Sequence, residues 1–163
     1  QKTTLFENAT RIPLVIAGPG VSETGKVAKG PVEMVDIYPT LTALAGLDTP
    51  AAVSGKSLVP MLADVSHSVR QAALTQFSSG YSIRTERYRY THWGPDGSLG
   101  AELYDHQNDN AEMVNLANRP ESSAVVKELS ALLKSRIAQA NVPPKGVRQI
   151  RFDDRRAVPQ PNP

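Results

Sequence analysis

The distribution of hydrophobic residues near the N-terminus predicts one buried strand. Residues 12–17 (IPLVIA) are almost continuously apolar, which is typical of a strand covered on both faces of a parallel sheet. Pro13 lacks an amide hydrogen, so we expect it at the start of this strand and not at its middle. A buried parallel strand needs neighbouring strands, and no other segment of the chain has this character. The pattern therefore predicts that an N-terminal part precedes these residues.

The next segments show apolar residues separated by three or four positions, which is the spacing of a helix. Residues 36–45 predict a helix that Asp36 caps at its N-terminus and that Gly46 ends. Residues 58–62 predict a short turn of helix, or a loop packed down by its apolar residues. One face of the first helix collects four apolar residues, namely Ile37, Leu41, Leu44 and Ala45.

The middle of the chain changes to the period of two that strands require. Residues 72–77, 81–93 and 102–105 predict an antiparallel sheet, and the turn of the 81–93 hairpin is expected at residues 85–87. On the second strand of the hairpin, one face is expected to carry Tyr88, Tyr90 and His92, and the other Arg89, Thr91 and Trp93.

The longest periodic stretch lies near the C-terminus. Residues 120–140 predict an amphipathic helix, with Glu121 in its first turn and Lys134 near its end, both in agreement with the helix dipole. A capping-box spacing at residues 109–112 predicts a short helix that runs through Leu116. Residues 142–163 are rich in proline and arginine and are predicted to be extended or disordered. The apolar stripe of the long helix consists of Val125, Leu129, Leu132, Leu133 and Ile137.

The amino-acid composition narrows the classes of protein to which this chain can belong. With 40% hydrophobic and 21% charged residues, the 163-residue chain is ordinary globular material. A net charge of +2 is too small to indicate a nucleic-acid partner. The absence of cysteine excludes a disulfide framework and a thiol nucleophile. No apolar run reaches the roughly 18 residues that span a bilayer, and the polar start is unlike a signal peptide, so no membrane association is expected.

The candidate metal ligands are scattered along the sequence and form no metal-binding motif. The three histidines, His67, His92 and His106, lie on separate predicted segments, so we expect no metal site in this chain. The acidic stretch between residues 105 and 112 has the wrong spacing for an EF-hand and lacks its glycine, and turn or helix-cap chemistry explains it better. Neither a Gly-x-Ser-x-Gly motif nor a glycine-rich phosphate loop is present.

Cations alternate with aromatic residues in the predicted hairpin. Such a face can stack bases or hold anions, and it can equally form cross-strand pairs and cation–π contacts. We favour the structural interpretation, because the spaced triple of aromatic residues that marks an RNA-binding sheet is not evident. The group consists of Arg84, Arg87, Tyr88, Arg89, Tyr90 and Trp93.

Six segments between residues 2 and 140 follow one another in a characteristic order. They are Lys2 with residues 5–14, residues 19–20, residues 32–47, residues 55–58, residues 80–93, and residues 102–105 with Asp109, Glu112, Asn115 and Leu116. Together they resemble the C-terminal part of a sulfatase of the iduronate-2-sulfatase-like kind, within the alkaline phosphatase superfamily. The segment 81–93 carries the likeness to the iduronate-type branch.

The resemblance implies an α/β fold in two parts. Residues 1–70 would be the C-terminal segment of the α/β catalytic domain and would supply its last strand and helix. Residues 71–141 would form a small antiparallel sheet with a long C-terminal helix, and residues 142–163 a Pro/Arg-rich tail. The partner implied for this chain is the N-terminal part of the sulfatase domain.

The resemblance also implies a chemistry. Sulfatases cleave sulfate esters with a formylglycine, made from the Cys or Ser of a Cys/Ser-x-Pro-x-Arg motif, beside a calcium ion. Preorganised positive charge then meets the charge that develops on the transferred group. Lys2 matches the last lysine of the family that contacts sulfate, and a compact ammonium suits that contact. His92 and Trp93, at the end of a hairpin strand, are candidates for the substrate pocket.

This chain departs from the family in one decisive respect. The nucleophile motif, the calcium ligands and the other catalytic residues belong upstream and are absent from these 163 residues. The chain alone is therefore expected to be inactive, and turnover of an aryl sulfate with calcium would contradict this. Alternatives are a phosphate or phosphonate monoester hydrolase of the same superfamily, and a non-catalytic anion- or glycan-binding module. The resemblance implies a periplasmic or extracellular location, which the residues themselves do not show.

Overall fold

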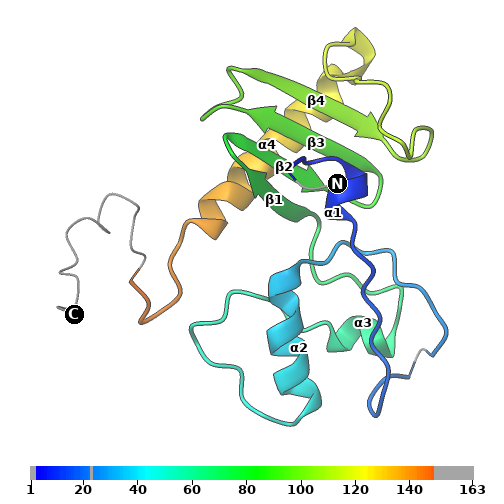
Figure 1. The fold of residues 1–163 in the computed structure, drawn as a ribbon, viewed down its shortest axis with the longest axis vertical. Helices are drawn as coiled ribbons and strands as arrows, with labels where there is room; N and C mark the ends of the chain where they lie inside the picture. Colours follow the sequence, from blue (N-terminus) through cyan, green and yellow to red (C-terminus); the bar gives the residue numbers. More distant parts are fainter. Residues whose placement is uncertain (1–2, 23, 149–163) are drawn as a thin grey trace, which may run out of the picture.

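A computed structural model describes residues 3–22 and 24–148, and its centre is a small antiparallel sheet (Figure 1). Its four strands follow one another as a meander, in the order β1-β2-β3-β4. This confirms the predicted strands and the hairpin with its turn at residues 85–87. The strands are β1 (Ala73–Phe77), β2 (Gly80–Arg84), β3 (Tyr88–Trp93) and β4 (Gly100–Asp105).

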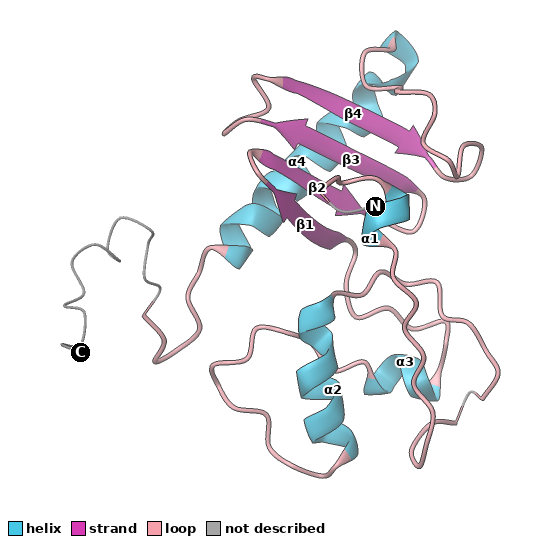
Figure 2. Ribbon diagram, viewed as in Figure 1, coloured by secondary structure: helices cyan, strands magenta, loops and turns pink. Residues whose placement is uncertain are grey.

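The helix α4 (Ser123–Ala140) covers one face of the sheet and follows a 3-10 turn at Pro120–Ser122 (Figures 1 and 2). Leu129 and Leu133 of its apolar stripe are buried against the strands. This confirms the predicted amphipathic helix. The buried core between helix and sheet consists of Ala72, Ile83, Tyr90, Leu103, Leu129 and Leu133.

The opposite face of the sheet carries the short helix α1 (Glu7–Thr10), as Figure 1 shows. Because side chains alternate along a strand, residues next to those of the core point to this side. Arg89 and Thr91 of β3 are buried here, where their polar atoms meet Ser82 of β2. The sheet therefore packs apolar side chains against α4 and hydrogen-bonded polar side chains toward α1.

Two further helices lie below the sheet in Figure 1, namely α2 (Ile37–Leu44) and α3 (Val59–Ala63). The helix α2 was predicted, and at residues 58–62, where the prediction was a short turn of helix or a packed loop, the structure has the helix. Gly46, at φ +68°, ends α2 in the left-handed conformation that glycine favours. The predicted face of α2 is only partly realised. Pro39 and Thr40 are buried, whereas Leu41 is 58% exposed.

Asp36 lies where predicted but does not cap α2 with its side chain. Its carboxylate instead accepts the backbone N–H of Glu33 and of Lys56, each at 2.8 Å, and binds the guanidinium of Arg70. Glu33 also accepts Arg70, at 2.6 Å, and Arg136 of α4, at 2.8 Å. These ion pairs connect the region of α2 and α3 to the sheet and to α4.

The strand predicted at residues 12–17 does not form in the described part of the chain. A strand exists only where another segment accepts and donates its backbone hydrogen bonds, and none of the described segments pairs with these residues. The predicted burial is likewise not realised, since Val15 is 87% and Ile12 51% exposed. An apolar stretch suited to a sheet interior therefore lies open on this chain.

The prediction of a short helix at residues 109–116 is also wrong. Asp109 does cap the turn, because its Oδ2 accepts the N–H of Val114 at 2.9 Å. Glu112, however, has a left-handed backbone (φ +56°) and directs its side chain inward, which a helix would not permit.

Among the described residues no helix is long and apolar enough to cross a bilayer. The tail prediction for residues 149–163 lies outside the described residues.

Candidate functional site

The segment that follows Lys2 is fixed at one end of the sheet. Lys2 itself lies outside the described residues, but Leu5, three positions later, is buried. A β-carbon built on Gly80 would lie 2.6 Å from Trp93 Cζ3 and 2.9 Å from Leu5 Cδ1. Both side chains therefore cover this glycine, which leaves no room for a larger residue. Phe6 adds a tilted ring contact with Tyr104 at 5.8 Å.

Ion pairs hold α1 on the face of the sheet opposite α4. Arg89 Nη2 donates to Glu7 Oε2 at 2.6 Å and to Thr10 Oγ1 at 2.8 Å. Arg89 Nε donates to Glu112 Oε1 at 2.5 Å, and Arg84 Nε donates to Glu7 Oε2 at 3.1 Å. Burial raises the pKa of the Glu7 carboxyl, but Arg84 and Arg89 outweigh this effect and hold that pKa below its usual value. Glu7 is thus a carboxylate at neutral pH.

Arg87, another cation of the hairpin, is also paired within the chain. Arg87 binds both carboxylate oxygens of Asp105, at 2.8 and 2.7 Å, and its guanidinium carbon lies 4.7 Å from the centre of the Tyr88 ring. Together with the buried ion pairs of Arg89, this confirms the structural interpretation of the alternating cations and aromatic residues. Arg89 is 2% exposed, so a bound polymer could not reach it.

The Arg87–Asp105 pair predicts a pH dependence of stability. The hydrogen bond from Arg87 is the main cause that lowers the pKa of Asp105 to about 2. Because the folded pKa lies below the unfolded value of about 3.9, the pair stabilises the fold above pH ~4, and this contribution is lost as the pH falls toward 2. We expect Asp105→Asn to flatten the dependence of unfolding free energy on pH in this window. Urea unfolding at a series of pH values measures it, and an unchanged slope would contradict it.

His92 and Trp93 do not come together in the structure. His92 is 2% exposed and faces the α4 side with Tyr81, in an edge-on ring contact at 5.9 Å. Burial, and then the charge of Lys134, lowers the pKa of His92, so the ring is neutral at pH 7. Trp93 lies on the opposite face, where its Nε1 donates to Glu102 at 3.1 Å. A substrate contact of either residue stays a prediction, and Trp93 is the one on the side of α1.

One cluster of the described residues has the donor atoms of a metal site. A ligand atom from each of Glu7, His106 and Glu112 lies within 4.8 Å of the others. The carboxylates, however, already bind the guanidinium groups of Arg84 and Arg89, whose positive charge opposes a cation. Calcium also prefers six to eight oxygen ligands. The donor set therefore does not fit the calcium that the resemblance implies, and we assign this cluster to charge pairing.

An apolar surface, which we call the seam, joins residues 12–17 to α2. Side chains from both segments line a hollow of about 260 Å³, among them Leu14, Ile37 and Leu41. The exposed large hydrophobic residues Val15, Tyr38 and Leu41 lie on the same two segments. Apolar patches of this kind mark surfaces where another polypeptide binds.

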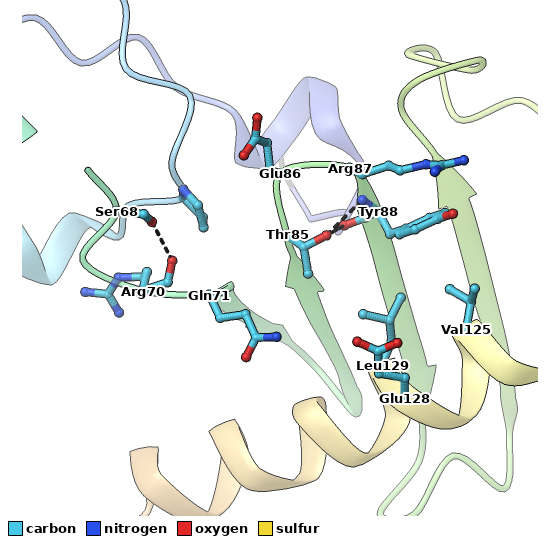
Figure 3. A pocket seen from close by; sticks show the side chains of 11 residues that line it. Ser68, Arg70, Gln71, Thr85, Glu86, Arg87, Tyr88, Val125, Glu128 and Leu129 are labelled. Atoms are coloured by element: carbon cyan, nitrogen blue, oxygen red, sulfur yellow. Dashed lines mark hydrogen bonds between the residues drawn. The ribbon is translucent and has the colours of Figure 1, made fainter. Parts of the chain in front are cut away.

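A second hollow, of about 430 Å³, lies between residues 68–71, the β2–β3 turn and α4 (Figure 3). Arg70 and Arg87 line it, but their guanidinium groups turn away from it in Figure 3. Arg70 binds Glu33 and Asp36, and Arg87 binds Asp105. The guanidinium groups of Arg70 and Arg87 are therefore not available to a ligand in this hollow.

Comparison with known proteins identifies the chain. Residues 1–139 match the family model described as N-sulphoglucosamine sulphohydrolase, C-terminal. The chain belongs to this sulfatase family. A sulfatase from Formosa agariphila is 37% identical over 133 residues, which are 81% of this chain and 25% of that protein. The chain thus spans about a quarter of the length of this curated relative.

Solved structures agree with the sulfatase fold. A 2-O GAG sulfatase matches with a TM-score of 0.72 and 28% identity, over 98% of this chain and 34% of the other. A phosphonate monoester hydrolase from Silicibacter pomeroyi matches with a TM-score of 0.71 and 26% identity, over 85% of this chain and 31% of the other. These likenesses confirm the predicted fold class and the predicted family. The division at residues 70 and 141 stays a prediction.

Sequence reasoning missed the ion pairs that hold α1. Glu7, Arg89 and Glu112 were noted only as members of separate motifs, and 105 positions separate Glu7 from Glu112. No local pattern reports contacts across that distance. The sequence holds only an indirect sign of these ion pairs. Arg89 is charged, yet it lies directly beside a strand residue that belongs to the hydrophobic core, which suggests that its charge is paired inside the protein.

Proposed function

We propose that this chain is the C-terminal part of a sulfuric ester hydrolase that acts on sulfated carbohydrate together with an N-terminal catalytic part. The observation that carries this proposal is the family match over residues 1–139. The 37% identity to a sulfatase and the structural match to a 2-O GAG sulfatase support the reaction and the substrate class.

The N-terminal part supplies the reactive groups in this proposal. Calcium and formylglycine are expected of the whole sulfatase, and the described residues here offer no site for either. This chain contributes a supporting sheet, the seam on which the N-terminal part of the catalytic domain packs, and Lys2. The ammonium of Lys2 contacts a sulfate oxygen and stabilises the charge that develops there.

A chimera tests the contribution of Lys2. The 163-residue chain replaces the corresponding C-terminal quarter of the Formosa agariphila sulfatase, and hydrolysis of 4-methylumbelliferyl sulfate and of a 2-O-sulfated disaccharide is measured. We expect the chimera to release sulfate and the isolated chain to release none. Lys2→Ala is expected to lower kcat/KM by about 100-fold, as the loss of one oxyanion-stabilising donor does.

The matched control is Lys29→Ala, which removes an exposed loop lysine and should leave kcat/KM unchanged. Lys2→Arg should retain part of the activity, because it keeps the charge but not the compact shape of the ammonium. Equal activities of the Lys2→Ala and Lys29→Ala chimeras would overturn the role of Lys2. An inactive unmodified chimera with a native-like melting transition would overturn the proposed function.

Phosphonate ester hydrolysis is the second candidate, because a phosphonate monoester hydrolase shares the fold at a TM-score of 0.71. The nucleophile in the polypeptide that precedes this segment separates the two candidates. A Cys or Ser in the formylglycine motif indicates sulfate esters, whereas a Thr or Ser bound directly to metal indicates phosphoryl transfer.

A further inference from the structure

His92 is a titratable residue on the face of the sheet that α4 covers. It lies two positions after the core residue Tyr90 on β3, so its side chain points to the same side. Tyr81 lies opposite it on β2 and contacts the imidazole edge-on at 5.9 Å. Only 2% of His92 is exposed, so water cannot solvate a charge on this ring.

The turn that follows β3 covers the ring from another side. Gly97 has a left-handed backbone (φ +87°), and a β-carbon built on it would lie 3.3 Å from His92 Cβ and 3.5 Å from Nδ1. Nε2 of the same ring is buried and has no hydrogen-bond partner among residues 3–22 and 24–148. Buried polar atoms without a partner are rare in native proteins. The imidazole therefore packs here much as an apolar ring does, which it can do only while it is uncharged.

The charges that act on His92 also disfavour its protonation. Within the described part of the chain these are Lys134 of α4 and Asp96 of the turn, beside the titratable ring of Tyr81. Ala101, the neighbour of His92 on β4, has no ionisable group. Burial lowers the pKa of His92 most, Lys134 lowers that pKa further, and Asp96 does not offset the two. A protonated ring would thus be a buried cation that Lys134 repels.

We propose that His92 is a pH-sensitive contact in the packing of α4 on the sheet, where the neutral ring holds the helix in place and its protonation loosens the helix. The unfolded chain binds the proton with the ordinary histidine pKa of about 6.5, whereas the folded pKa is lower. The contribution of His92 is therefore complete above pH ~6.5. Below it, the ratio of packed to loosened chain falls by up to about tenfold per pH unit, until the folded pKa is reached.

Hydrogen exchange of the 163-residue chain between about pH 7.5 and about pH 5 tests this proposal. Protection factors, corrected for the intrinsic pH dependence of exchange, are measured at the amides of Leu129 and Leu133 in α4. We expect them to fall by up to about tenfold per pH unit below 6.5. His92→Phe keeps an aromatic ring but cannot bind a proton, so the part of the fall that is due to His92 should disappear. The matched control is His67→Gln, at an exposed histidine, which should keep the whole fall.

Each outcome decides the proposal. An equal fall in the unmodified chain and in His92→Phe would overturn it, because another group would then cause the fall, and so would constant protection in the unmodified chain. If His92→Phe does not fold, Lys134→Gln replaces it, since this exposed residue can be changed without disturbing the core. Removing its charge should make the fall smaller, and an unchanged fall would overturn the proposal. None of these measurements uses sulfate ester hydrolysis, so the result is independent of the proposed function.

Discussion

Replacing Arg89 with alanine is expected to lower the free energy of unfolding by about 3–5 kcal/mol, because it leaves the buried carboxylate of Glu112 without a guanidinium partner. Glu112 then keeps no guanidinium partner, and Glu7 keeps Arg84 and the exposed Arg11. Two like charges remain close together where water cannot screen them. Urea unfolding followed by fluorescence measures the loss, and Trp93, the single tryptophan of the chain, lies on the affected face.

The surface offers a control in which both partners are exposed. Arg119→Ala also removes an arginine–carboxylate pair, but the side chains of Arg119 and Glu121 are 51% and 68% exposed. Exposed ion pairs contribute little in water, so this variant should unfold close to the unmodified chain. Equal losses for Arg119→Ala and Arg89→Ala would show that burial of the pair is not what makes it important.

Replacing Asp36 with alanine is expected to cost a similar amount, about 3–5 kcal/mol, for a related reason. Asp36 is fully buried and accepts two backbone N–H groups besides the guanidinium of Arg70. Its removal leaves those two amides without a partner and leaves Arg70 bound to Glu33 alone. Hydrogen exchange at the amide of Lys56 should accelerate together with the fall in the urea midpoint.

Asp48→Ala is the control for this variant, because Asp48 lies exposed in the loop after α2. It should change neither the exchange rate of Lys56 nor the midpoint. If Asp36→Ala behaved like Asp48→Ala, the buried charges between α2 and the sheet would not be what holds these regions together.

The sheet and α4 were predictable because their signals are local. The stripe from Val125 to Ile137 repeats every three or four residues, and that repeat alone fixes which side of α4 meets the strands. The hairpin likewise follows from alternation on both sides of residues 85–87. Such patterns report on neighbours within about one turn or one strand, and those neighbours are present in this chain.

Two of the predictions that failed did so because contacts with distant segments outweigh the local sequence pattern. A capping-box spacing at residues 109–112 favours a helix, but Glu112 is drawn inward by Arg89 and His106, which lie on other segments. Asp36 is a residue type that often caps helices, yet its carboxylate binds the guanidinium of Arg70 instead. In both cases a distant guanidinium outweighs a local preference worth about 1 kcal/mol. The same reasoning explains why the contacts around Glu7 could not be seen in advance.

The open stretch at residues 12–17 has a consequence for the chain in solution. Unpaired backbone groups flanked by apolar side chains form a template on which strands of other molecules add. Concentrated samples of the isolated chain are therefore prone to intermolecular β-assembly that begins at Leu14 and Val15. Pro13 restrains that growth, since it offers no amide hydrogen for a neighbouring strand to bind.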